Sequence, residues 1–290
     1  MSIPVIVVCA HKGGVGKTKH AIITAENFSY VRNKKGLGID LDSQGNFAMR
    51  FLKMDLEAGL KDGKRPPPHP AYKETDPEHQ QRNSIANIYM GLGVDPYPTA
   101  IENFEVLPGY ASKFLKIKAV SMQEQINKVQ ERLKIFINLP QIQNAYDYIV
   151  IDTPPSTEAL TISAFRAATH LLIPSEMEPY SISGIYGMLQ LWKQENEIRA
   201  NNDKLEIIGI FPNKVNRTKL HKDILASLEE NKGVGKYIAP CYLGDRIIFA
   251  ETDADTANPR TIFDLPDNNK AKIDATRVAN FIFKKVFGND

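Results

Sequence analysis

The stretch Lys12-Gly13-Gly14-Val15-Gly16-Lys17-Thr18 decides the fold of this chain. It lies between an apolar run at residues 5–9, typical of a buried strand, and a segment from 17 to about 31 with the pattern of a helix. Glycines in such a turn let backbone amides point inward and form an electropositive cradle, to which the helix N-terminus adds partial positive charge. Lys17 can then reach terminal phosphates, and the Thr18 hydroxyl can ligate Mg²⁺. The stretch therefore predicts a phosphate-binding loop.

The rest of the chain alternates strand and helix patterns. We expect strands at residues 5–9, 37–40, 104–107, 148–151, 170–174 and 205–211, and helices at about 17–31, 121–137, 157–168, 181–199, 218–230 and 269–286. Gly36 and Gly38 interrupt the second of these strands. The alternation predicts an α/β fold, a three-layer sandwich whose mostly parallel, twisted sheet is covered on both faces. We expect a single domain over residues 1–290.

A segment from residue 53 to about 82 breaks this rhythm. It contains five prolines among charged residues, namely Pro66, Pro67, Pro68, Pro70 and Pro77. This composition predicts an extended or mobile insertion on the surface of the domain. A solvated insertion without a ligand is the favoured interpretation, and a polyproline element that docks a partner is the alternative.

Composition excludes several classes of protein. The 290 residues are 42% hydrophobic and 24% charged, and no apolar run approaches the roughly 18–20 residues of a membrane span. Cys9 and Cys241 are the only cysteines, which excludes a disulfide framework or a four-thiolate metal site from one chain. A net charge of +2 neither requires nor excludes binding to nucleic acid. No cationic leader precedes the first strand, so we expect a cytoplasmic protein.

Two acidic motifs follow predicted strands. In Asp40-Leu41-Asp42-Ser43-Gln44-Gly45-Asn46, alternation places Asp40 and Asp42 on one side of an extended segment. In Tyr148-Ile149-Val150-Ile151-Asp152-Thr153-Pro154-Pro155-Ser156, a strand ends in Asp152 at the carboxyl edge of the sheet, where open α/β folds bind ligands. A D-x-D pair alone is often only solvated. Together with the phosphate loop, these motifs predict carboxylates around a Mg²⁺–phosphate centre.

The phosphate loop departs from the pattern G-x-x-x-x-G-K-[ST], because His11 replaces the first glycine and a second lysine, Lys12, opens the loop. The resulting KGGVGKT resembles the signature-lysine variant of the ParA/MinD group of P-loop ATPases. The resemblance implies ATP and Mg²⁺ as cofactors, and an ATP-induced homodimer in which Lys12 reaches the partner's ATP. Such a second cation would stabilise the charge that develops during phosphoryl transfer.

The acidic motifs resemble the same family. The first is similar to the ParA-type D-x-D-P-Q-G-N, with Ser43 in place of proline, which implies that Asp42 positions or activates the attacking water and that Asp40 acts through water on the metal. Asp152 resembles the Walker B aspartate, which holds a Mg²⁺-bound water. D-x-P-P-S is the family's γ-phosphate-sensing switch. Lys19, where relatives carry Thr or Ser, receives no role.

Later segments resemble the parts of the family that bind the adenine base of ATP and DNA. Asn213 is expected to hydrogen-bond the adenine, with residues 242–245 along its other edge. Six Lys or Arg stand against three Asp or Glu between residues 214 and 236. The resemblance implies that this region, together with Arg246, binds DNA without sequence preference. The alternative is that the basic residues form an ordinary solvated helix face. The expected DNA contacts are Lys214, Arg217, Lys219, Lys222 and Arg246.

The resemblance implies an ATPase for plasmid or chromosome partition that works on the nucleoid with a ParB-like centromere-binding adaptor. Because the first strand opens the chain, we expect the short partition type, without an N-terminal operator-binding helix-turn-helix. The alternative is a MinD-like membrane-cycling ATPase, with residues 281–288 as an amphipathic anchor. We favour a last helix packed on the core, because Ile273, Val278, Phe281 and Ile282 continue one stripe, and expect no stable membrane association. Lys12 argues against a biosynthetic enzyme of this fold, and the cysteine count argues against an iron–sulfur carrier.

Overall fold

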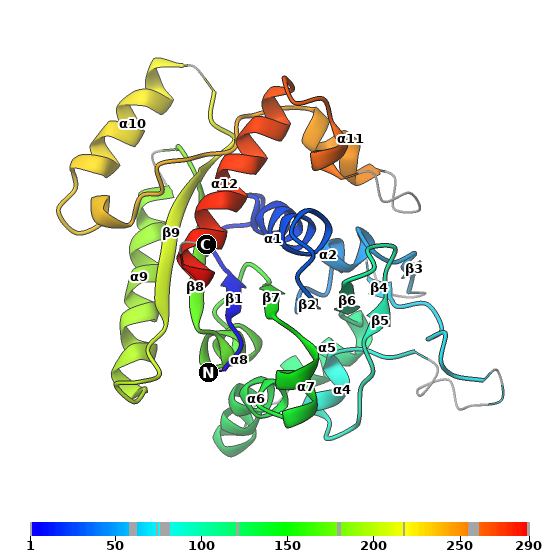
Figure 1. Cartoon of the computed structure of the whole chain (residues 1–290). Helices are drawn as coiled ribbons and strands as arrows, with labels where there is room; N and C mark the ends of the chain where they lie inside the picture. The colour runs from blue at the N-terminus through cyan, green and yellow to red at the C-terminus, as the bar shows by residue number, and fades with distance from the viewer. Residues whose placement is uncertain are drawn as a thin grey trace.

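A computed structural model describes residues 2–57, 63–73, 75, 82–119, 122–178, 181–216, 218–254 and 261–288. Within these residues, seven strands form one sheet in the order β5-β6-β2-β7-β1-β8-β9 (Figure 1). The strands are β1 (Val5–Val8), β2 (Gly36–Asp40), β5 (Tyr97–Pro98), β6 (Phe104–Leu107), β7 (Tyr148–Asp152), β8 (His170–Glu176) and β9 (Glu206–Asn213). All neighbours pair in parallel except β5, which runs antiparallel to β6 at the edge.

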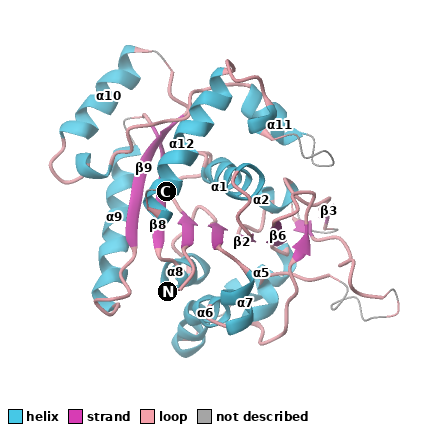
Figure 2. Cartoon of the chain, in the orientation of Figure 1, coloured by secondary structure: helices cyan, strands magenta, loops and turns pink. Residues whose placement is uncertain are grey.

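Helices cover both faces of this sheet (Figures 1 and 2). One face carries α1 (Lys17–Ala25), α2 (Asn46–Met49), α11 (Ile248–Ala254) and α12 (Lys270–Phe287), with the short turn η3 (Ile262–Asp264). The other carries α4 (Ala86–Tyr89), α5 (Ala111–Lys118), α6 (Gln123–Ile137), α7 (Pro140–Ala145), α8 (Ala159–Ala167), α9 (Ser181–Ile198) and α10 (Lys219–Glu230), with the turn η2 (Gly235–Tyr237).

Alternate strand residues supply the two cores between these layers. In β1, Val5 and Val7 join the core under α6, α8 and α9, whereas Ile6 and Val8 join the core under α1 and α12. This two-residue period is what a sheet buried on both faces requires. The predicted α/β three-layer fold is confirmed, and each predicted strand lies within two residues of its expected bounds.

The glycines of β2 are required by aromatic neighbours. A Cβ on Gly36 would lie 2.3 Å from the ring of Tyr148, and a Cβ on Gly38 would lie 2.6 Å from ring atoms of Phe104 and Phe47. The strand forms despite its glycines because these rings fill the space that side chains would occupy. The helix expected at 17–31 is also present, but it divides into α1 and a π-helical segment, η1 (Glu26–Val31).

The described part of the proline-rich insertion is packed against the sheet edge. Two short strands, β3 (Asp55–Leu56) and β4 (Lys64–Arg65), pair antiparallel. The buried His69 ring lies 4.5 Å from that of Tyr97, whose hydroxyl donates to the Pro67 carbonyl at 2.8 Å. An imidazole and a phenol thus hold the described prolines at the sheet edge, and the expected extended or mobile surface insertion stays a prediction. Pro77 lies outside the described residues.

The last helix, α12, packs on the core as expected. Val278 and Ile282 are fully buried, and the ring of Phe281 lies 5.9 Å from that of Phe211 on β9. In the part of the chain that the structure describes, no helix has the length and apolarity needed to cross a membrane.

The contacts of Gly38 generate a stability prediction. Gly38→Ala should lower the free energy of unfolding by about 1–3 kcal/mol, because the added methyl group overpacks the rings above β2. Urea denaturation measures this difference. Gly93→Ala is the matched control, because a Cβ there meets nothing within 4 Å, and it should change stability by less than about 0.5 kcal/mol. Equal effects of the two substitutions would contradict the packing described for β2.

Candidate nucleotide-binding site

Three loops meet at the carboxyl edge of the sheet, after β1, β2 and β7. In the parallel register, Asp152 on β7 is paired with Val8 on β1 and with Asp40 on β2. A cavity of about 510 Å³ opens at this edge. Its wall is formed by Gly13, Gly14, Gly16, Lys17, Thr18, Lys19, Ile22, Asp42, Asn46, Met49, Arg50 and Pro155. The structure therefore brings the phosphate loop and both acidic motifs together.

The phosphate loop has the geometry of an anion cradle. Gly14 and Gly16 have φ angles of +78° and +93°, a region that L side chains rarely adopt. Cβ atoms on Gly13 and Gly14 would meet nothing within 4 Å, so the loop borders open space. The Lys17 ammonium donates to the Lys12 carbonyl at 3.2 Å, folded back under the loop. These residues fit a chain of phosphates, because three loop glycines and Lys17 line one small cavity at the start of a helix.

Thr18 links the loop to the Walker B position. Its hydroxyl donates to Asp152 Oδ2 at 2.7 Å, whereas the buried Asp152 Oδ1 has no hydrogen-bond partner among the described residues. Burial raises the pKa of Asp152 to about 7. A hydroxyl and a carboxylate with one oxygen unpartnered within the described residues fit a Mg²⁺ ion, which would supply positive charge beside them.

Asp40 lies beside Asp152 and is fully buried. Burial, followed by the charge of Asp152, raises the pKa of Asp40 well above its ordinary value. Its carboxylate accepts from the amides of Asp42 at 3.0 Å and Ala48 at 2.8 Å, so it also fixes the turn that carries Asp42. Within the described residues no three His, Cys, Asp or Glu side chains form a metal site by themselves. Mg²⁺ typically uses few protein ligands and relies on water and substrate phosphates, which suits this arrangement.

Lys12 points to its own chain's surface carboxylates. Its ammonium lies 2.6 Å from Glu178 Oε2 and 3.6 Å from Glu176 Oε2. The hydrogen bond to Glu178 raises the pKa of Lys12, which stays charged. Both Lys12 and Glu178 side chains are 48% exposed, so the pair is weak and open to exchange.

Asn213 braces the phosphate loop. Its side chain is buried, and its amide nitrogen donates to the Val15 carbonyl at 2.8 Å. A Cβ on Gly16 would lie 2.1 Å from this nitrogen, so the glycine is needed for their close approach. The amide of Leu243 donates to the Pro212 carbonyl at 3.1 Å, which places residues 242–245 beside the end of β9. The adenine contact itself stays a prediction.

The expected DNA contacts have different environments. Lys214 pairs with Glu176 at 2.7 Å, and Arg246 donates to Asp274 Oδ2 from Nε at 2.9 Å and from Nη2 at 2.7 Å. Lys219 and Lys222 are exposed at the start of α10 and have no ion pair within the described residues. Arg217 lies outside the described residues. The DNA-binding set therefore stays a prediction, with Arg246 already engaged by a carboxylate.

Two residues of the cavity wall had no role predicted from the sequence: Lys19, which was noted without one, and Arg50, which was not singled out. Lys19 donates to the Phe249 carbonyl at 2.7 Å, which ties the phosphate-loop helix to α11. Arg50 pairs with Glu26, which lies 24 residues earlier in the chain. Arg50 is the first cation after the D-x-D motif, but no spacing pattern links it to Glu26.

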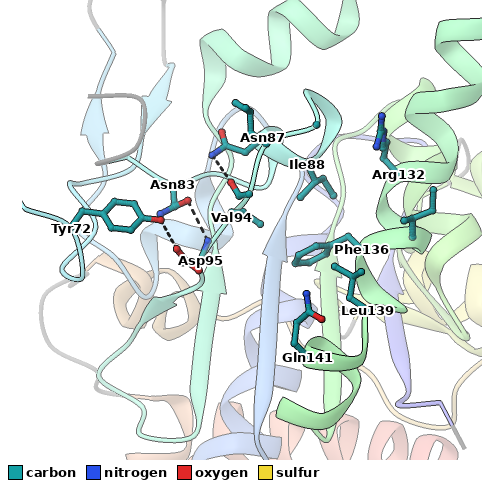
Figure 3. Close-up of a pocket in the computed structure, with 14 residues that line it drawn as sticks. Tyr72, Asn83, Asn87, Ile88, Val94, Asp95, Arg132, Phe136, Leu139 and Gln141 are labelled. Atoms are coloured by element: carbon teal, nitrogen blue, oxygen red, sulfur yellow. Dashed lines mark hydrogen bonds between the residues drawn. The ribbon is translucent and has the colours of Figure 1, made fainter. Parts of the chain in front are cut away.

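A larger cavity, of about 700 Å³, lies elsewhere and contains none of the predicted site residues. Figure 3 shows Ile88, Phe136 and Leu139 pointing toward it, with polar groups around them. Tyr72 of the insertion donates to Asp95 at its border. Size alone does not identify the functional site in this molecule.

The position of Asn213 generates a test of its role. Asn213→Ala should weaken binding of ATP and GTP analogues equally, by roughly tenfold, because a lost buried hydrogen bond to Val15 loosens the loop regardless of the base. Fluorescence titration with both analogues measures this. A loss confined to the adenine nucleotide would contradict the bracing role and would support direct contact with the base.

Comparisons with known proteins show the family of this chain. A family model described as AAA domain matches residues 3–207 of the chain, which include the phosphate loop and both acidic motifs. The chain is 25% identical over 288 residues to a virulence plasmid ParA family protein of Chlamydia psittaci, covering 97% of this chain and 95% of the relative. It is 27% identical over 230 residues to the chromosome-partitioning ATPase Soj of Thermus thermophilus, covering 79% and 76%.

A solved structure shares the fold. The complex of Cyanothece McdA with ATP matches with a TM-score of 0.72 at 16% identity, covering 100% of this chain and 98% of that one. The likeness extends over the whole sheet and both helical layers, and the family match includes the motifs that line the cavity. The chain thus belongs to the AAA domain family and is a ParA-type member of the ParA/MinD group of P-loop ATPases.

Proposed function

We propose that this protein is a partition ATPase that segregates plasmid or chromosomal DNA. It binds ATP with Mg²⁺, forms a dimer, holds DNA without sequence preference, and leaves the DNA when an adaptor stimulates hydrolysis. The observation that supports this best is the meeting of Lys17, Thr18 and Asp42 around one cavity, with Asp152 bonded to Thr18 behind it, while the loop's extra lysine faces outward. We place it in the cytoplasm, on the nucleoid.

The cavity residues divide the work of hydrolysis. The loop amides and Lys17 would hold the phosphates, and Thr18 would exchange its bond to Asp152 for Mg²⁺, with Asp40 and Asp152 holding the water ligands. Mg²⁺, when bound, supplies charge neutralisation at the phosphates. Asp42 lines the cavity. Within the described residues its Oδ1 accepts one hydrogen bond, from the amide of Gln44 at 3.0 Å. It would orient the attacking water and accept its proton.

Dimerisation would use the outward lysine. In the monomer Lys12 pairs with Glu178, and in the dimer it would exchange this carboxylate for the phosphates bound by the partner subunit. A cation supplied in trans acts only when both subunits hold nucleotide, because each ammonium needs the other's phosphates to replace its lost ion pair. The state of the nucleotide would therefore control assembly.

DNA binding would follow from the dimer. Lys219 and Lys222 are exposed on α10, and two copies bring at least four such cations to one surface. Affinity for duplex DNA rises steeply with the number of phosphates neutralised. The Thermus relative is named a chromosome-partitioning ATPase and the Chlamydia relative a virulence plasmid ParA family protein, which supports DNA as the cargo. A ParB-like adaptor is the partner that we propose.

The direct test is binding to a duplex of arbitrary sequence. With Mg²⁺ and ATP the protein should bind, with a log–log salt slope of about −3.6 if four phosphates are neutralised, and Lys12→Ala should not. Lys219→Ala/Lys222→Ala should weaken binding and reduce the slope, while Lys128→Ala on α6 serves as control. ATP-dependent co-sedimentation with liposomes, without DNA binding, would overturn the proposal in favour of a MinD-like membrane cycle.

The role of Asp42 gives a second prediction. Asp42→Ala should lower ATP turnover by about 100-fold or more, because it removes the group that handles the proton. Nucleotide affinity should stay within about threefold, since the phosphate-holding groups are untouched. Phosphate release and fluorescent-nucleotide titration measure the two quantities, with Asp223→Ala on α10 as control. Unchanged turnover would rule out this role.

A further inference from the structure

A buried ion pair forms part of the wall of the nucleotide cavity. Arg50 Nε and Nη2 lie 2.8 Å and 2.7 Å from Glu26 Oε1, and the two side chains are 3% and 2% exposed. Arg50 lines the same cavity as Lys17, Thr18 and Asp42. This pair belongs to neither the phosphate loop nor the acidic motifs, and it brings a guanidinium to the reaction centre.

Stability alone does not account for such a pair. Removing two charges from water costs several kcal/mol per ion, and well-packed apolar side chains of similar volume are often as stabilising or more so. A buried pair therefore suggests a requirement for a fixed geometry that apolar packing would not impose. Two charge-assisted hydrogen bonds to one carboxylate oxygen fix the guanidinium in distance and direction.

The two ends of the pair are attached to the two halves of the catalytic site. Glu26 begins the π-helical segment η1, which continues directly from α1, the helix that starts with Lys17 and Thr18. Arg50 caps the C-terminal end of α2, the turn that follows the D-x-D motif.

The opposite end of α2 is held by Asp40. Its Oδ2 accepts the amide of Ala48 at 2.8 Å, and its Oδ1 accepts the amide of Asp42 at 3.0 Å. A single helical turn is thus tied to Asp40 on β2 at one end and to Glu26 beyond α1 at the other. The chain of contacts runs from the phosphate-loop helix through Glu26, Arg50 and α2 to the turn of Asp42.

We propose that Arg50 and Glu26 are positioning residues for hydrolysis, which fix α2 against the phosphate-loop helix and thereby set Asp42 relative to Thr18. The inference rests on the proposed ATPase function. Binding of nucleotide depends on the loop itself, so the pair should influence the chemical step more than affinity. Loss of the pair lets the turn of Asp42 shift, and a displacement of about 1 Å can reduce a rate by roughly 100-fold.

The test replaces the pair by apolar residues of similar size, Arg50→Met/Glu26→Leu. Turnover should fall at least tenfold, while the affinity for a non-hydrolysable ATP analogue stays within threefold and the unfolding midpoint is unchanged or higher. Arg50→Lys, which keeps the charge, should retain more of the activity. The control is Arg166→Met/Glu131→Leu, an Arg–Glu pair between α8 and α6 on the other face of the sheet, which should leave turnover unchanged.

Hydrogen exchange separates this inference from the proposed function. The amides of residues 46–50 should exchange at least tenfold faster in Arg50→Met/Glu26→Leu, with no change in α9. If the wild-type protein does not hydrolyse ATP, the proposed function is refuted. The rate of amide exchange in α2 would still show whether the Arg50–Glu26 pair holds this helix in place. Wild-type turnover in the double variant, a loss of affinity equal to the loss of turnover, or unchanged exchange at α2 would overturn the inference.

Discussion

The parallel register of β1, β2 and β7 is the constraint on which the site depends. It pairs Asp152 with Val8, the last residue of β1, and with Asp40, the last residue of β2. Loops that leave these strands therefore begin at one edge, and the Thr18 hydroxyl can reach Asp152 at 2.7 Å. A shift of one residue in this pairing would turn the strand's apolar residues toward the wrong core and would separate the two acidic motifs. Packing of the core and assembly of the site thus require the same strand register.

Charge is distributed unevenly around that edge. Two neighbouring buried carboxylates, Asp40 and Asp152, have raised pKa values because burial disfavours their ionised forms, and the charge of Asp152 raises the pKa of Asp40 further. Lys17 and Arg50 border the same cavity, whereas Lys12 lies outside it with Glu178. One copy of the chain therefore already has cations positioned to hold phosphates, and it carries a further cation, Lys12, on its surface. This separation is the physical basis for our proposal that the reaction centre is completed by a second copy.

The sequence predicts what depends on short-range pattern. Apolar residues that recur every two residues, or with the helical period, locate the strands and the long helices. The candidate site is located by four residues that follow strands, because parallel strands end at a common edge; they are Lys17, Thr18, Asp40 and Asp152. Contacts between distant residues leave no such pattern. The Arg50–Glu26 pair, the Arg246–Asp274 pair and the anchoring of the insertion by His69 and Tyr97 were not foreseeable, since each depends on how elements pack.

The central claim is that two copies complete each other's reaction centre through Lys12. A crystal structure with Mg²⁺ and a non-hydrolysable ATP analogue tests it most directly. The account predicts a two-fold dimer in which the Lys12 ammonium has left Glu178 and lies against the phosphates bound by the partner subunit. A nucleotide-loaded monomer, with Lys12 still paired to Glu178, would contradict it.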